Sequence, residues 1–246
     1  MKKKKSELYV FYCLLVIHFS SFSQILSIDH TDLKKNGLSG FTELDFDYNK
    51  STQVDWEFIN NTYINYAALK YSLIFMNKID INKAASSEIS NNGYQHVRIL
   101  YNLKKNFFIE SFIQNQYDLI QDVKNRKIIG LGFKRTILNL NYIGMSIFYE
   151  YELLIDDILN KCYRFNLYNQ LYFKIFNNLT SSSFLYIQPS LINFSDLRLT
   201  FKSTFSVPLF KQFFFNLTIL FTHDSSPAFN IPKTNYHILN GLKFKF

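Results

Sequence analysis

The sequence predicts a transmembrane antiparallel β-barrel, an all-β, up-and-down fold of about twelve strands preceded by a cleavable signal peptide. Three observations carry this prediction. The chain starts with a basic and then apolar segment, continues with a long series of segments in which apolar and polar residues alternate, and joins them by connections that alternate between short and long. At 246 residues, of which 48% are hydrophobic and 18% aromatic, it is long enough for one large all-β domain.

The first 23 residues have the pattern of a signal peptide. The basic stretch MKKKK precedes an apolar run, LYVFYCLLVIHF at residues 8–19, and the small residues Ser21 and Ser23 precede a plausible cleavage point before Gln24. The alternative, a membrane anchor, is disfavoured because a helical span needs about 20 apolar residues. We therefore expect export through the Sec pathway and removal of this segment.

The rest of the chain divides into two predicted parts. Residues 24–38 are expected to form a periplasmic N-terminal segment, and residues 39–246 the transmembrane β-barrel domain. Four lysines lie in the signal segment, so the net charge of +8 is no argument for binding nucleic acid. Cleavage would leave Cys162 as the only cysteine, which excludes an intrachain disulfide and a cysteine-based metal site.

Alternation with a period of two places successive side chains on opposite faces of a strand. In SDLRLTFKSTFSV, residues 195–207, leucines and phenylalanines occupy one face, and charged residues and threonines the other. After the signal segment, no run of 18 apolar residues predicts a membrane helix. Most alternating segments reach the roughly 9–11 residues that a tilted strand needs to cross a bilayer. The expected strands lie at 40–49, 53–64, 68–79, 91–103, 107–117, 127–137, 142–153, 162–175, 179–189, 195–207, 212–223 and 235–246.

The connections between these segments alternate in length. Outer-membrane barrels have short turns on the periplasmic side and longer loops on the extracellular side. A soluble β-sandwich, the alternative fold, has no reason to sort its loops in this way. Short turns are expected near Tyr66, Lys104-Lys105, 139–141, Asn177-Asn178 and Pro208, and longer loops at 80–90, 118–126, 154–161 and 224–234, with a shorter one near Asn193.

The sequence ends on an alternating strand, GLKFKF. Leu242, Phe244 and Phe246 are expected to face lipid, and the lysines between them the lumen. A last strand with a terminal aromatic residue resembles the signal read by the outer-membrane insertion machinery, so these three residues are the predicted membrane-insertion signal. The expected partners are outer-membrane lipid and, during biogenesis, the barrel-assembly machinery, with no nucleic acid. We expect a monomer.

Charged residues recur on the polar faces of the strands. An Arg or Lys that faced lipid at mid-depth would cost roughly 2–4 kcal/mol, so these residues are expected to face the lumen. They could form ion pairs that fill a narrow interior, or line the constriction of a pore. Mixed charge favours ion pairs, because a selective channel tends to carry one sign. The predicted lumen charge network comprises Arg98, Glu110, Lys134, Glu150, Glu152, Arg164, Lys174, Arg198 and Lys202, and Asp196 is expected to face the same way.

One pair within this set can be specified further. Arg98 and Glu110 lie on the polar faces of neighbouring expected strands, on either side of the turn at Lys104-Lys105. Counting back from that turn places Glu110 opposite Arg98 or one diagonal step from it. We therefore expect the guanidinium of Arg98 to pair with the carboxylate of Glu110.

Four stretches resemble a known family. They are NNGYQHVRILYNLKKNFFIESFIQNQYD (91–118), FYEYE (148–152), FSDLRL (194–199) and IPKTNYHILNGLKFKF (231–246). In order and spacing they resemble the domain-of-unknown-function 481 family, the salt-induced outer-membrane proteins, over most of residues 39–246. This resemblance implies a β-barrel in the outer membrane of a Gram-negative bacterium. The biochemical activity of the family is not established, so the resemblance implies no catalytic residues.

These observations predict an outer-membrane β-barrel of unassigned biochemical activity that is not an enzyme. A structural or stress-related role with a charge-filled lumen is expected, and a small-solute pore is the alternative. A weaker alternative, a membrane-embedded lipid hydrolase, rests on His223-Asp224 beside Ser225-Ser226, although adjacency in sequence does not establish a catalytic arrangement. No metal or cofactor is expected, because the histidines show no metal-binding spacing and IGLGF (129–133) lacks the pattern of a phosphate-binding loop.

Overall fold

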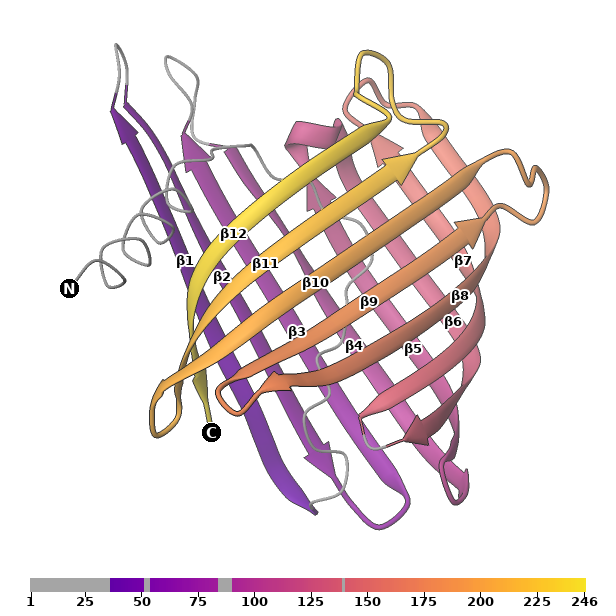
Figure 1. Ribbon diagram of the computed structural model, residues 1–246. Coiled ribbons are helices and arrows are strands. Elements are labelled where there is room, and N and C mark those ends of the chain that lie inside the picture. The colour runs from indigo at the N-terminus through magenta and orange to yellow at the C-terminus, as the bar shows by residue number, and fades with distance from the viewer. Residues whose placement is uncertain (1–35, 51–53, 84–89, 139) are drawn as a thin grey trace.

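A computed structural model describes residues 36–50, 54–83, 90–138 and 140–246, and the predicted signal peptide at residues 1–23 lies outside these ranges. In the described part of the chain, twelve antiparallel strands follow one another around a closed barrel, and β12 pairs with β1 (Figure 1). The strands are β1 Gly37–Lys50, β2 Val54–Ala67, β3 Tyr71–Lys83, β4 Ser90–Lys104, β5 Phe107–Asp118, β6 Val123–Leu138, β7 Asn141–Leu154, β8 Leu159–Phe176, β9 Leu179–Pro189, β10 Leu197–Phe210, β11 Phe213–Asp224 and β12 Thr234–Lys245.

The predicted fold class is confirmed, and every expected strand is present, with shifted ends except at β9, which has the expected bounds 179–189. β1 begins at Gly37, inside the segment expected to be periplasmic, and β10 begins at Leu197, which leaves Asp196 in the preceding loop. The turn expected at Pro208 falls instead at Lys211 and Gln212, beyond the end of β10. Proline is tolerated in this strand because the ladder between β10 and β11 shifts register between Pro208 and Phe210.

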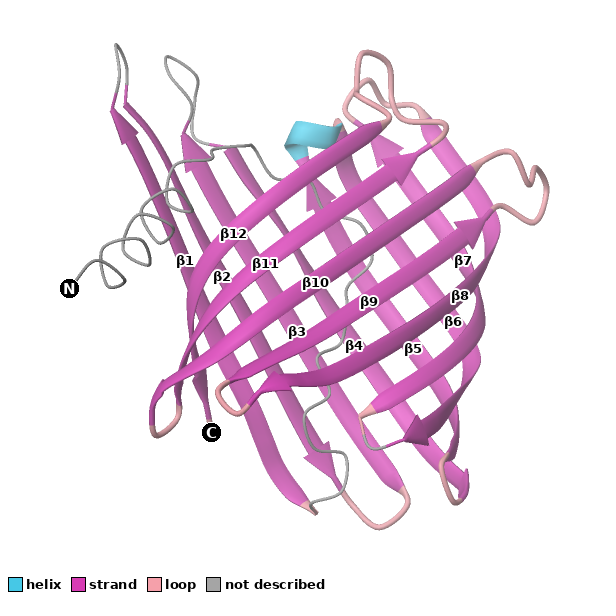
Figure 2. Cartoon of the chain, in the orientation of Figure 1, coloured by secondary structure: helices cyan, strands magenta, loops and turns pink. Residues whose placement is uncertain are grey.

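The connections separate by length onto the two ends of the barrel (Figure 2). Short turns at 68–70, 105–106, 177–178 and 211–212 lie at one end, here called the short-turn end. The other end, called the long-loop end, carries the connections at 155–158, 190–196 and 225–233 and the short 3-10 helix η1, Leu119–Gln121. The loop around Asn193, expected to be short, therefore matches its neighbours in length. Among the described residues no helix is long and apolar enough to cross a membrane.

The barrel closes through a short seam between its first and last strands. β1 pairs with β2 along its whole length, but with β12 only from Phe41–Lys245 to Asp45–Gly241 in the printed register. Beyond Phe41, the backbone groups of Gly40 and Phe246 exchange two N–H···O hydrogen bonds of 3.0 Å. The aromatic ring of Phe246 lies over Gly40, where any larger residue would collide with it.

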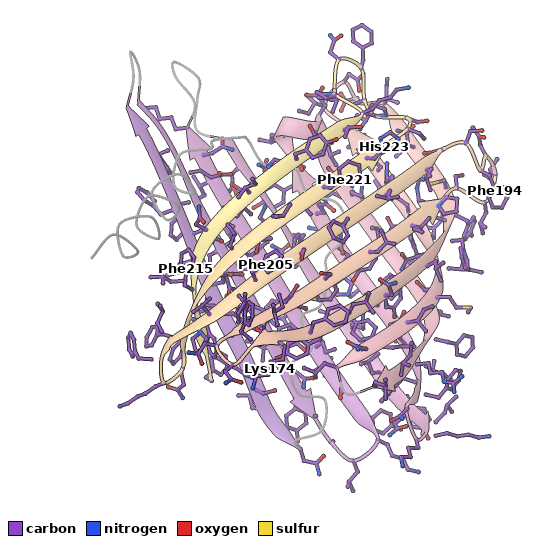
Figure 3. All side chains as sticks on the ribbon, in the orientation of Figure 1. Lys174, Phe194, Phe205, Phe215, Phe221 and His223 are labelled. Carbon is purple, nitrogen blue, oxygen red and sulfur yellow. The ribbon has the colours of Figure 1, made fainter. Side chains whose placement is uncertain are left out.

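The two faces of the wall differ in character, as the sequence alternation predicts. On β6 the outward side chains of Ile129, Leu131 and Phe133 are exposed, whereas the inward side chains of Ile128 and Lys134 are buried. The same alternation continues on the front strands β10 and β11, where Figure 3 labels Phe205, Phe215 and Phe221. An apolar exterior around a polar interior is the arrangement of a barrel that spans a membrane.

Candidate functional site: the filled lumen

The lumen near the long-loop end contains a network of three arginines and four carboxylates, here called the long-loop network. Arg198 of β10 is its centre. The guanidinium Nη1 of Arg198 lies 2.7 Å from Glu150 Oε2, and its Nη2 lies 3.3 Å from Glu152 Oε1. Its Nε donates to Asp224 Oδ2 at 2.8 Å. Glu150 and Glu152 belong to β7, three strands from β10, so Arg198 connects strands that are not neighbours in the wall.

Two further arginines complete the long-loop network. Arg126 of β6 donates to Glu152 through both Nε and Nη2. Arg164 of β8 places Nε 3.5 Å from Glu150 Oε1 and donates from Nη2 to Asp196 Oδ2 at 2.8 Å. Because each arginine contacts at least one carboxylate and the two signs nearly balance, the network is built to satisfy its own charges. A ring of one sign, as in a selective filter, is not present among the described residues.

A second cluster lies deeper, where β4, β5 and β8 face the interior. The guanidinium Nη1 of Arg98 lies 3.0 Å from Glu110 Oε2, and the two side chains are 1% and 0% exposed. The residues are diagonal in the ladder, since Arg98 pairs with Phe112 and Glu110 with Leu100. The hydroxyl of Tyr168, three strands away on β8, donates to Glu110 Oε2 at 2.6 Å. This contact therefore crosses part of the lumen, between strands that are three apart in the twelve-stranded wall.

Aromatic side chains pack around this cluster and were not expected from the sequence. Phe112 and Tyr168 flank the guanidinium of Arg98, with ring centres 5.0 and 5.8 Å from its central carbon, which is a cation–π arrangement. The ammonium of Lys134 lies 3.7 Å from the ring centre of Tyr142. A side chain at Gly130 would collide with the rings around it, so glycine there makes room for them. The buried apolar cluster in the lumen comprises Phe112, Ile128, Tyr142, Phe148, Tyr168, Phe184 and Tyr186.

On the seam side the lumen contains a small cavity of about 40 Å³. A cavity of this size holds a few water molecules, since one water needs roughly 10–15 Å³ by the same measure. Glu43 of β1 accepts a hydrogen bond from Asn216 there, and the ammonium of Lys243 lies 3.7 Å from the ring centre of Phe41. Lys202 also lines this cavity.

The structure thus divides the predicted charge network into parts. It brings together Glu150, Glu152, Arg164 and Arg198 in one place and Arg98 with Glu110 in another. Lys134 lies over the ring of Tyr142 at the edge of the cluster of Arg98 and Glu110, without an ion pair among the described residues. Lys202 lies at the seam-side cavity. Lys174 is exposed near the short-turn end of β8 and forms no ion pair among the described residues (Figure 3).

Sequence reasoning missed Arg126 and the aromatic cluster for identifiable reasons. The predicted strand began at residue 127, one residue after Arg126, so this arginine was assigned to a loop. Phe112 and Phe148 do carry a signal, because they occupy inward positions between polar residues such as Glu110 and Gln114. The predicted insertion signal is placed at the seam, with Leu242 and Phe246 exposed and Phe244 packed 5.1 Å from the ring of Phe213.

The residues suggested for a lipid hydrolase have other partners. The ring of His223 is hydrogen-bonded to the hydroxyl of Thr234, 2.9 Å away. The hydroxyl of Ser225 donates to the carbonyl of Ser195 at 2.7 Å and accepts from the backbone N–H of Leu197. No group of His, Cys, Asp and Glu side chains suited to a metal ion occurs in the part of the chain that the structure describes.

The fold and lumen define a class, the closed transmembrane β-barrels. Among solved structures, the chain resembles the NanC porin, with a TM-score of 0.51, 7% identity, and coverage of 85% of this chain and 100% of the porin. The translocator domain of the autotransporter NalP from Neisseria meningitidis matches with a TM-score of 0.49 and 7% identity over 88% of this chain and 91% of that domain. The KdgM porin matches with a TM-score of 0.45 and 12% identity over 85% of this chain and 99% of the porin.

These comparisons concern the fold alone, since the identities are low. No protein-family model matches the sequence, and no curated protein is significantly similar to it. The resemblance to the salt-induced family therefore stays a prediction.

Proposed function

We propose that this chain is an outer-membrane barrel whose lumen is closed at rest by its own side chains, with a structural role and without enzymatic activity. The single observation that carries this proposal is the set of direct contacts across the interior. Tyr168 of β8 reaches Glu110 of β5, and Arg198 of β10 reaches Glu150 of β7. An open water-filled pore would leave such side chains hydrated, yet Glu110 is fully buried.

The location follows from the wall. An exterior of exposed apolar side chains needs a bilayer, and closed β-barrels of this kind belong to outer membranes. The outward apolar side chains at Leu242, Phe244 and Phe246 are suited to the assembly machinery of that membrane. If the resemblance to salt-induced proteins extends to physiology, the barrel contributes to envelope integrity under osmotic stress, and its abundance should rise during growth in high salt.

The proposal is tested by conductance across planar bilayers. The wild-type protein should give no steady conductance steps. The double variant Arg198→Ala with Tyr168→Ala, which removes one side chain from each of these two contacts across the interior, should conduct. Tyr163→Ala, which removes an exposed tyrosine from the outward face of the same strand, is the matched control and should stay silent. Frequent steady openings of the wild-type protein would overturn the closed-lumen proposal.

A second candidate is a gated channel for small solutes. It is favoured by the seam-side cavity, where Lys202 lines a space that already admits water. The NanC protein, which this chain resembles in fold, is a porin. In such a channel the long-loop network would be the gate, and wild-type openings would appear only under a voltage or with a solute that competes for its arginines.

A further inference from the structure

A row of polar side chains crosses the outward face of five consecutive strands. In the printed register Thr42 of β1 pairs with Thr62 of β2, Thr62 with Asn77 of β3, Asn77 with Gln95 of β4, and Gln95 with Asn115 of β5. We call these five residues the polar row. Its members alternate along their strands with buried lumen residues, which include Tyr63, Met76 and Tyr94. The polar row therefore points away from the lumen, toward the membrane.

On β1 to β3 the polar row interrupts an apolar surface and does not lie at its edge. On β3, Asn77 has the outward residues Phe75 on one side and Ile79 on the other, 38% and 37% exposed. On β1, Thr42 is followed by the outward residues Leu44 and Phe46, which are also exposed. On β6 the register continues from Asn115 to the exposed, outward Lys127, whereas the outward positions from Ile129 to Phe133 and from Ile143 to Ile147 are apolar.

The polar row satisfies only part of its own hydrogen-bonding capacity. Asn60, beside the row on β2, donates to Thr42 at 3.0 Å and accepts from Thr62 at 3.2 Å. Gln95 donates through Nε2 to Asn77 Oδ1 at 3.3 Å. That bond uses the side-chain carbonyl of Asn77 and the side-chain NH₂ group of Gln95. The amide nitrogen of Asn77 and the amide oxygen of Gln95 have no hydrogen-bond partner among the described residues.

An amide that faces hydrocarbon cannot be completed by water. Polar side chains of this kind stabilise association between membrane-spanning segments, because a second protein surface can supply the missing partner. The spare groups here are one donor and one acceptor, side by side on neighbouring strands. Two copies related by a two-fold axis can join such groups reciprocally, since each copy presents the same patch to the other.

We propose that the outward face of β1 to β4 is the interface of a homodimer, in which Asn77 and Gln95 hydrogen-bond across the two-fold axis to Gln95 and Asn77 of the second copy. A second copy is the favoured occupant because the patch is uncharged and complementary to itself. A lipid headgroup would be expected to meet charged side chains. The members of the polar row on β1 to β4 carry none, and the charged Lys127 lies two strands beyond them on β6. The expectation of a monomer from sequence alone rested on no feature of this face.

The first experiment is site-directed cross-linking in proteoliposomes. In a mature protein with Cys162 replaced by serine, Asn77→Cys should form a disulfide-linked dimer under mild oxidation. Asn169→Cys is the matched control, because Asn169 is an amide on the outward face of β8, away from the polar row. It should remain monomeric under the same conditions. Equal cross-linking at the two positions would indicate random collision in the bilayer and would overturn the proposal.

The second experiment measures self-association of the refolded protein. Asn77→Leu combined with Gln95→Leu should raise the dimer dissociation constant roughly tenfold, as expected for the loss of two hydrogen bonds between membrane-spanning surfaces. Asn169→Leu should leave it unchanged. Both variants should still fold, since leucine suits a lipid-facing position, and a heat-modifiable gel band checks this. A wild-type protein that is monomeric in nanodiscs of native lipid composition, or a double variant that dimerises as before, refutes the proposed interface.

Discussion

Glu110→Ala tests the cluster that crosses the lumen. The change removes the acceptor of two hydrogen bonds, from Arg98 at 3.0 Å and from Tyr168 at 2.6 Å. Arg98 would remain charged with 1% of its side chain exposed and no carboxylate beside it. Breaking one side of a buried ion pair costs about 3–5 kcal/mol, and a buried hydroxyl that loses its acceptor costs about 1–3 kcal/mol. The two costs are not strictly additive, so we expect a loss of about 4 kcal/mol or more.

The double variant Glu110→Ala with Arg98→Ala should be less destabilised than Glu110→Ala alone, because no unpaired charge remains. Contacting residues in a network typically couple by about 0.5–3 kcal/mol, and we expect a value in the upper half of this range. Arg98→Met with Glu110→Leu should recover more stability, because it also fills the vacated volume. Reversible unfolding by urea in detergent micelles, followed by fluorescence, gives the free energies. If the effects of the two alanine substitutions simply add, the residues are not energetic partners and the reasoning fails.

Three other predictions concern location, assembly and the long-loop network. The protein should fractionate with the outer membrane and run as a heat-modifiable band, and recovery as a soluble periplasmic protein would exclude the barrel. Replacing Phe246 by Asp should lower the yield of folded protein much more than Lys245→Gln does, because the ring of Phe246 covers Gly40 on the outward face. Similar yields of folded protein from the two variants would contradict this prediction. Arg198→Ala should lower the free energy of unfolding by about 3 kcal/mol or more, because it removes the arginine that Glu150, Glu152 and Asp224 share. The exposed Lys174→Ala should change it by less than about 0.5 kcal/mol, and equal effects would show that the long-loop network is not stabilising.

The fold was predictable because its signals are local. Alternation shows which face of a strand each residue occupies, and this holds for Arg98, Glu150 and Arg198 alike. The turn at Pro208 was misplaced because proline usually ends a strand, and only the register shift beside it shows why β10 continues.

The partners of lumen residues were less predictable, because they depend on distances across the barrel. Arg98 and Glu110 could be paired from the sequence since a short turn joins their strands. The contact between Tyr168 and Glu110 depends on how far the strands tilt and stagger when the barrel closes, which no local pattern records. For the same reason Lys174, on the polar face of its strand, could not be recognised as lying near the end of the barrel.

The short seam has a consequence for rearranging the chain. β1 begins and β12 ends at the short-turn end, where Gly40 and Phe246 are already hydrogen-bonded to each other. A linker of a few residues between Phe246 and Gly37 would therefore form one more hairpin, and new termini could be opened at the turn 177–178. In this circular permutant the seam would lie between β8 and β9, and the pairing of β12 with β1 would form between neighbours in sequence. Comparing the folding rates of the two chains would measure how much of the assembly barrier comes from bringing the first and last strands together.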